Sequence, residues 1–156
     1  MDGREKAEGG TDVKIMVSAC LIGRKCKYSG GDNFDERTAA LLRGHELVPV
    51  CPEVAGGLGV PRRPCEIVGD TVMNDRGENV DEAFRKGAEI CLEKAREEGI
   101  DLAVLQPRSP SCGVRSVYDG TFSGRLTGGS GIFARLLMEN GFRVVDAEEF
   151  ASGEER

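Results

Sequence analysis

Short apolar runs and longer amphipathic segments alternate along this chain. Four runs rich in Val, Leu and Ile have the length and composition of buried strands. They span residues 13–20, 45–51, 100–105 and 142–146. The segment "IVGDTVMND" adds a short strand pair or hairpin, whereas the Gly-rich segment "YDGTFSGRLTGGSG" is expected to be an irregular loop.

Helical periodicity appears in three segments between these strands, namely residues 34–43, 81–98 and 132–140. In the clearest of them, 81–98, Phe84, Gly87 and Cys91 fall on one face, and Gly99 ends the helix. Strands that are apolar throughout and alternate with helices are typical of a mainly parallel sheet covered on both faces. The sequence therefore predicts an α/β fold, a three-layer sandwich with a mostly parallel, Rossmann-like sheet.

The length of 156 residues suggests a single domain. We expect it to span residues 12–150, between a flexible tail at 1–11 and a C-terminal tail at 151–156. A net charge of −6 without Trp or a basic run argues against general nucleic-acid binding. No apolar run approaches the roughly 20 residues of a membrane span, and the N-terminus lacks the apolar segment of a signal peptide. A cytoplasmic location is expected, and the sequence indicates no oligomeric state.

Six cysteines in a reducing compartment favour metal binding or catalysis over disulfides. Cys20 and Cys51 end predicted strands, and Cys112 lies a few residues beyond a third strand, in the loop "SPSCG". Ligands of parallel sheets gather beyond the carboxyl ends of the strands. We therefore expect these three thiols to meet on one rim. The alternative is that they are ordinary buried cysteines, since free Cys is among the most buried residue types.

Three thiolates suit few metal sites. Structural zinc takes four ligands, and the only histidine, His45, is expected on the opposite rim. Iron–sulfur clusters are normally held by four cysteines, so three would leave one iron open to act as a Lewis acid. Cys26 could supply a fourth ligand or a resolving thiol, or be a spare loop cysteine. Cys65 has no assigned role, and Cys91 is expected in the core.

Polar residues near these cysteines are candidates for chemistry. Glu53, two residues after Cys51, could be a general acid or base beside a metal site, or a solvated surface carboxylate. Ser109 and Ser111 could hydrogen-bond a ligand or cap a turn. Arg62 and Arg63 could pair with acidic residues or contact substrate.

The segment "GRLTGGSGIF" places glycines around the start of a predicted helix. Backbone N–H groups at such a position, here Gly128, Gly129 and Ser130, can bind a polar edge of a substrate. The spacing matches neither the dinucleotide fingerprint nor the P-loop, and a simple turn is the alternative.

Five motifs in order resemble the bacterial family catalogued as domain of unknown function 523. They are "SACLIGRKCKYSGGDN", "PVCPEVAGGLGVPRRPCEI", "RSPSCG", "YDGTFSG" and "GGSGIFARLL", and the resemblance covers residues 14–145. Characterised relatives are thiouracil desulfidases that hold a 4Fe-4S cluster on three cysteines and remove sulfur without net redox change. The resemblance implies that Cys20, Cys51 and Cys112 are the cluster ligands and that Glu53 acts beside the cluster. It also implies a catalytic serine, for which Ser111 is preferred to Ser109.

This resemblance leads us to expect hydrolytic removal of sulfur from a small thiolated pyrimidine such as a thiouracil, with release of sulfide. Arg63, Cys65 and Gln106 depart from the family pattern in segments expected near the pocket. The alternative is a non-enzymatic metal- or sulfur-binding module that uses the same three cysteines. Iron and sulfide in protein purified without oxygen would indicate the enzyme, and stoichiometric zinc would indicate the module.

Overall fold

A sheet of four parallel strands forms the centre of the computed structural model, which describes residues 13–153. The strand order is β2-β1-β5-β8, with β1 at Lys14–Ser18, β2 at Glu46–Val50, β5 at Leu102–Leu105 and β8 at Val144–Asp146. Each of the four predicted apolar runs contributes one strand. Pro49, which cannot donate a ladder hydrogen bond, lies in the edge strand β2.

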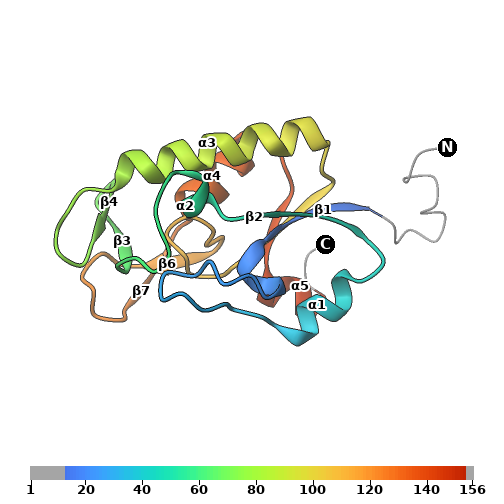
Figure 1. The fold of residues 1–156 in the computed structure, drawn as a ribbon, viewed down its shortest axis with the longest axis horizontal. Helices are drawn as coiled ribbons and strands as arrows, with labels where there is room; N and C mark the ends of the chain where they lie inside the picture. Colours follow the sequence, from blue (N-terminus) through green and yellow to red (C-terminus); the bar gives the residue numbers. More distant parts are fainter. Residues whose placement is uncertain (1–12, 154–156) are drawn as a thin grey trace.

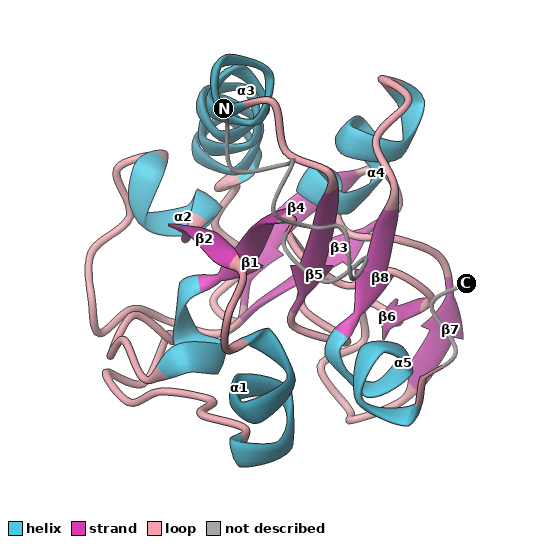
Figure 2. Ribbon diagram, turned by 90° about the vertical axis from the view of Figure 1, so that its right-hand side faces the viewer, coloured by secondary structure: helices cyan, strands magenta, loops and turns pink. Residues whose placement is uncertain are grey.

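Helices cover both faces of this sheet (Figures 1 and 2). One face carries α2 (Pro52–Ala55), α3 (Asp81–Glu98) and α4 (Ile132–Glu139), and the other carries α1 (Glu36–Leu42) and α5 (Ala147–Ser152). The predicted three-layer α/β architecture with a parallel sheet is therefore confirmed.

The strands divide their apolar side chains between two cores because successive residues point to opposite faces. Met16 packs toward α3 and α4, where Phe133 is completely buried. Ile15 and Val17 face the opposite core with Leu42.

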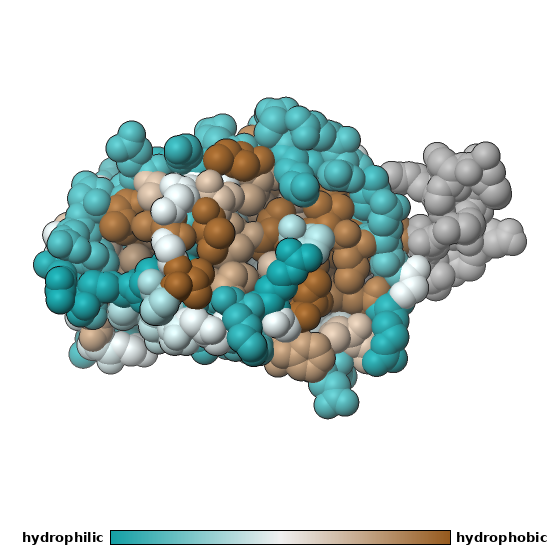
Figure 3. Space-filling view, in the orientation of Figure 1, coloured by the Kyte–Doolittle hydropathy of each residue, from teal (hydrophilic) through white to brown (hydrophobic). Residues whose placement is uncertain are grey.

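Apolar side chains also gather across the middle of one outer face of the molecule, between polar margins (Figure 3).

Two antiparallel hairpins extend from the sheet. β3 (Cys65–Val68) pairs with β4 (Thr71–Asn74), which confirms the strand pair expected there. β6 (Ser116–Tyr118) ends at the first residue of the segment predicted as an irregular loop and pairs with β7 (Leu126–Gly128) inside that segment. That prediction was incomplete because two three-residue strands are too short to show alternation.

Several boundaries differ from the sequence-based expectation. The run predicted as a strand over 13–20 ends at Ser18, and Cys20 lies in a 3₁₀ helix, η2 (Ala19–Ile22). The first helix begins later than expected, with Asp35 as the N-cap of α1. The C-terminal segment forms a helix, α5, because Asp146 and Glu149 make a reciprocal capping box at its start.

The expected N-terminal tail, residues 1–11, lies outside the described residues. α5 continues past the expected domain boundary at residue 150. His45 lies at the amino end of β2, as expected, where its Nδ1 accepts from the Val13 N–H at 3.1 Å. Among residues 13–153, no helix has the length and apolar character needed to cross a membrane.

Candidate active site

A cavity of about 670 Å³ opens beyond the carboxyl ends of β1, β2 and β5. Ligand sites in open parallel sheets lie at this edge. Five of the six cysteines line the cavity, and they are Cys20, Cys26, Cys51, Cys65 and Cys112. Cys91 is the exception and lies in the core between α3 and the sheet, as predicted.

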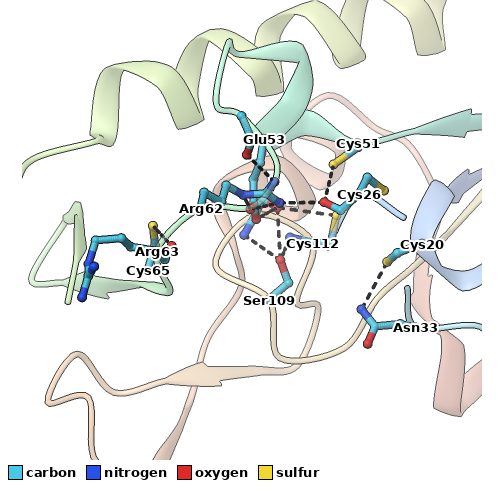
Figure 4. Close-up of polar contacts among 12 residues, drawn as sticks. Cys20, Cys26, Asn33, Cys51, Glu53, Arg62, Arg63, Cys65, Ser109 and Cys112 are labelled. Atoms are coloured by element: carbon cyan, nitrogen blue, oxygen red, sulfur yellow. Dashed lines mark hydrogen bonds and ion pairs between the residues drawn. The ribbon is translucent and has the colours of Figure 1, made fainter. Parts of the chain in front are cut away.

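Cys20, Cys51 and Cys112 enter this cavity from different segments (Figure 4). The Asn33 amide donates to Cys20 Sγ at 3.4 Å, and Ser111 Oγ lies 3.7 Å from Cys112 Sγ. Burial raises the pKa of the Cys20 thiol, and repulsion from Cys51 adds to this shift. Burial likewise raises the pKa of Cys112, with a further contribution from Cys20. All three thiols thus line the same cavity, and the surroundings of Cys20 and Cys112 oppose their ionisation.

The spacing of these thiols bears on what they could hold. In the described part of the chain, no three His, Cys, Asp or Glu side chains come close enough together to bind a single metal ion. Cys20, Cys51 and Cys112 nevertheless line one cavity from three separate segments. The donor set suits an iron–sulfur cluster, since thiolates are the usual ligands of such clusters.

Cys26 and Cys65 lie beside this trio. The Cys51 thiol donates to the backbone carbonyl of Cys26 at 3.8 Å. Burial raises the pKa of the Cys26 thiol to about 12, and the neighbouring Cys51 contributes. Burial raises the pKa of Cys65 to about 11, and its thiol donates to the Arg63 carbonyl at 3.4 Å. Both thiols thus lie next to the trio in surroundings that oppose their ionisation.

Glu53 faces the cavity and is held by Arg62. Arg62 Nε donates to Glu53 Oε1 at 2.8 Å, and Nη2 lies 2.6 Å from the same oxygen. The two side chains are only 9% (Arg62) and 13% (Glu53) exposed. The guanidinium also donates to the carbonyls of Gly59 and Cys26. Arg62 therefore fixes the orientation of Glu53. The sequence alone left two possible partners for Arg62, an acidic residue or the substrate, and the structure shows the acidic residue. Arg63 pairs with Asp75 instead.

The second oxygen of Glu53 contacts the "SPSCG" loop. Ser111 Oγ donates to Glu53 Oε2 at 3.0 Å, and Ser111 is buried. Ser109 Oγ accepts from the backbone N–H groups of Ser111 at 3.1 Å and Cys112 at 3.0 Å. Ser109 thus orders the turn, whereas Ser111 connects the carboxylate to the Cys112 sulfur.

A backbone contact between helices sets the place of Glu53. Gly56, which caps α2, would bring a Cβ to 2.0 Å from the Ala83 carbonyl oxygen, and a Cβ on Gly87 would lie 1.8 Å from the Pro52 carbonyl oxygen. Only glycine permits α2 and α3 to pack this closely. Sequence reasoning missed α2, although a glycine on the apolar face of α3 was a signal for close approach.

Gly128, Gly129 and Ser130 are not among the residues that line the cavity. Ser130 Oγ donates to the Val114 carbonyl at 2.8 Å. The first N–H groups of α4 are also occupied, because those of Ile132 and Phe133 donate to the carbonyls of Pro110 and Ser111. The geometry gives no support to the expected substrate-binding role of this segment, which stays a prediction.

Comparisons with known proteins identify the family of this chain. The family model described as 2-thiouracil desulfurase matches residues 15–149. An uncharacterized protein, YbbK, from Bacillus subtilis (strain 168) is 38% identical over 145 residues, which cover 86% of this chain and 96% of that protein. The solved structure of the [4Fe-4S]-dependent thiouracil desulfidase TudS is 37% identical and superimposes with a TM-score of 0.83, covering 90% of this chain and 95% of TudS. The chain belongs to the 2-thiouracil desulfurase family.

Proposed function

We propose that this protein is a 4Fe-4S-dependent desulfidase that hydrolytically removes sulfur from a thiocarbonyl base such as a thiouracil and releases sulfide. The observation that carries the proposal is that Cys20, Cys51 and Cys112 line one cavity together with Glu53 and Ser111. Membership of the family and the likeness to TudS support the same chemistry.

Cys20, Cys51 and Cys112 would hold the cluster and leave one iron without a protein ligand. When bound, such a cluster supplies a Lewis acid that can take the substrate sulfur and draw electron density from the carbon of the C=S bond. Asn33 donates to the Cys20 sulfur and can stabilise its negative charge, and Ser111 Oγ lies beside the Cys112 sulfur. Cys26 is a neighbour of the site without an assigned role.

Glu53 is the best-placed general base. Its Oε1 is held by Arg62, and its Oε2 accepts from Ser111, so the carboxylate has a fixed orientation in the cavity. Glu53 can accept a proton from the water that attacks the thiocarbonyl carbon, and Ser111 can pass a proton toward the departing sulfur. The balance is one water consumed, one C=S converted to C=O, and one H₂S released without oxidation or reduction.

The cofactor is tested on protein purified without oxygen. We expect a brown protein with about four iron and four sulfide ions per chain, as the cluster composition requires. Serine at Cys20, Cys51 or Cys112 should prevent assembly, whereas Cys91→Ala should retain the cluster, because Cys91 is buried elsewhere in the core. A colourless parent protein with stoichiometric zinc and no desulfuration would support the alternative, a metal- or sulfur-binding module.

The role of Glu53 is tested with Glu53→Gln, which keeps the size and loses the charge. We expect full cluster content with a loss of about 10²–10⁴-fold in desulfuration rate, the usual contribution of general acid–base catalysis. Glu46→Gln is the matched control, because Glu46 begins β2, at the end of the strand away from the cavity. A Glu53→Gln protein with full cluster and the parent rate would show that another group is the base.

A further inference from the structure

Aromatic side chains form part of the cavity wall that the proposed chemistry does not use. Both tyrosines of the chain, Tyr28 and Tyr118, line the cavity, and so does one of the six phenylalanines, Phe122. Tyr28 is 44% and Phe122 is 37% exposed, so neither ring is used to fill the core. Phe84 and Phe133, by contrast, are completely buried.

Phe122 is held in an unusual backbone conformation. Its φ of 56° lies in the left-handed region, which bulky side chains seldom adopt. One carboxylate oxygen, Glu66 Oε1, accepts from the backbone N–H groups of Gly120 at 2.9 Å and Phe122 at 3.1 Å. Polar bonds from Glu66, rather than burial of the ring, therefore fix this turn. Outliers of this kind cluster at sites that contact ligands.

The turn is also seated on a strand that borders the cavity. A Cβ on Gly120 would lie 2.6 Å from the Ile67 carbonyl oxygen, so the turn lies directly against β3. Glu66 belongs to the same strand, and Cys65 and Glu66 both line the cavity. The position of Phe122 is thus tied to the cavity wall by backbone contacts and by one carboxylate.

We propose that Phe122 is a specificity-determining residue whose ring stacks on the flat face of a heterocyclic thiocarbonyl substrate, and that Glu66 is the positioning residue that holds it there. This inference rests on the proposed function and names the substrate class of the same site. Glu53 and Ser111 would act on a C=S group, which acyclic thioamides share with thiolated pyrimidines. Only the pyrimidines also offer the flat face of a whole ring to an aromatic side chain.

Phe122→Leu tests the stacking, because Leu keeps apolar bulk and accepts the same backbone conformation with a similar cost. The two substrates are thiouracil, sulfur-substituted at the C2 position, and the acyclic thiourea. We measure KM and kcat with each substrate, and the Kd of uracil, the oxo product. For thiouracil we expect KM to rise roughly 3- to 10-fold, together with the Kd of uracil, which is the range of one aromatic pair. The kcat with thiouracil and the KM with thiourea should stay within about 2-fold, and Phe122→Tyr should restore parent values.

Leu126→Ala is the matched control in the same hairpin. Leu126 is an exposed apolar residue of β7 that does not line the cavity, so its loss should change none of these constants.

Glu66→Ala and Glu66→Gln test the positioning role. Glutamine retains the oxygen that accepts from Gly120 and Phe122, whereas alanine removes it. We expect Glu66→Ala to reproduce the KM and Kd changes of Phe122→Leu and Glu66→Gln to resemble the parent. The double variant Glu66→Ala/Phe122→Leu should show the same KM and Kd changes as either single variant, because both substitutions remove the same stacking contact.

The outcomes separate this inference from the proposed function. A parent that desulfurates thiouracil while Phe122→Leu changes neither KM nor the uracil Kd, or changes thiourea equally, overturns the stacking role alone. A parent that binds uracil in a Phe122-dependent way yet desulfurates nothing overturns the proposed function and leaves the aromatic contact standing. A parent that neither binds uracil nor acts on thiouracil overturns both.

Discussion

The backbone contact between α2 and α3 makes Gly87→Ala an informative perturbation. The new Cβ would lie 1.8 Å from the Pro52 carbonyl oxygen and 2.9 Å from the Gly56 nitrogen, whereas ordinary contact begins at 3.4 Å. Relief of the clash requires a shift of about 1.5 Å between the two helices. A shift of that size lengthens a donor–acceptor distance enough to break a hydrogen bond.

Glu53 would move with α2. Its Oε2 lies 3.0 Å from Ser111 Oγ, and the same shift would place this pair beyond hydrogen-bond reach. Overpacking costs about 1–3 kcal/mol, and alanine returns up to about 1 kcal/mol through its higher helix propensity. The net loss of stability is therefore about 0–3 kcal/mol. A misplacement of about 1 Å can nevertheless cost about 100-fold in rate.

Urea unfolding, iron content and desulfuration rate should be measured on the same anaerobic preparation of Gly87→Ala. We expect a modest loss of stability together with a rate loss of about 100-fold or more. Gly59→Ala is the control, because a Cβ there meets nothing within 4 Å and its φ is not positive. A Gly87→Ala protein that is about 1 kcal/mol more stable and retains the parent rate would refute the reasoning, because alanine would then be accommodated without moving α2.

Three further changes test other contacts. Arg62→Lys keeps a charge near Glu53 but cannot reproduce the guanidinium hydrogen bonds, so urea unfolding should show a loss of about 1–3 kcal/mol and turnover should fall. Burial, with a contribution from Cys51, raises the pKa of Cys91 from 9.0 to about 12. The protonated thiol therefore contributes its full share to the stability of the fold below pH 9, and this contribution is lost as the pH rises toward 12. Urea unfolding of the cluster-free parent should therefore weaken by about 1 kcal/mol between pH 9 and 10 relative to Cys91→Ala; parallel curves would contradict this. Burial opposes ionisation of Glu149, but bonds from Arg115 and the Asp146 N–H outweigh it and lower its pKa below 4.5. That stabilisation is present above pH 4.5 and is lost at lower pH, so the Tm of Glu149→Gln should fall less than that of the parent between about pH 5 and 3.

Local signals in the sequence were sufficient for the sheet and for the longest helix. The apolar face of α3 and the left-handed Gly99 at its end gave the bounds of that helix as the structure has them, Asp81–Glu98. Cys20, Cys51 and Cys112 could be assigned to one rim because parallel strands end at a common edge. α5 was not predicted, although Asp146 followed three residues later by Glu149 is a known helix-start signal.

Elements that depend on tertiary contacts could not be predicted. α2 is only four residues long and depends on the contact between Gly56 and α3, which no local pattern reveals. The pairing of Arg62 with Glu53 joins a loop to a helix, and a run of two adjacent arginines does not indicate which one turns inward. The geometry does not support the expected substrate-binding role of Gly128 and its neighbours, because the first N–H groups of α4 already donate to backbone carbonyls of the chain.

The placement of the three cysteines has a consequence for the order of folding. Cys20, Cys51 and Cys112 are separated by residues 21–50 and 52–111, so no short stretch of nascent chain contains all three. A cluster bound by all three could be completed only after Cys112, which follows β5, has been synthesised. Once in place, it would close two long loops and reduce the conformational entropy of the unfolded chain, as a cross-link does. Cofactor delivery would then be the last event of maturation and the one that makes the fold difficult to reverse.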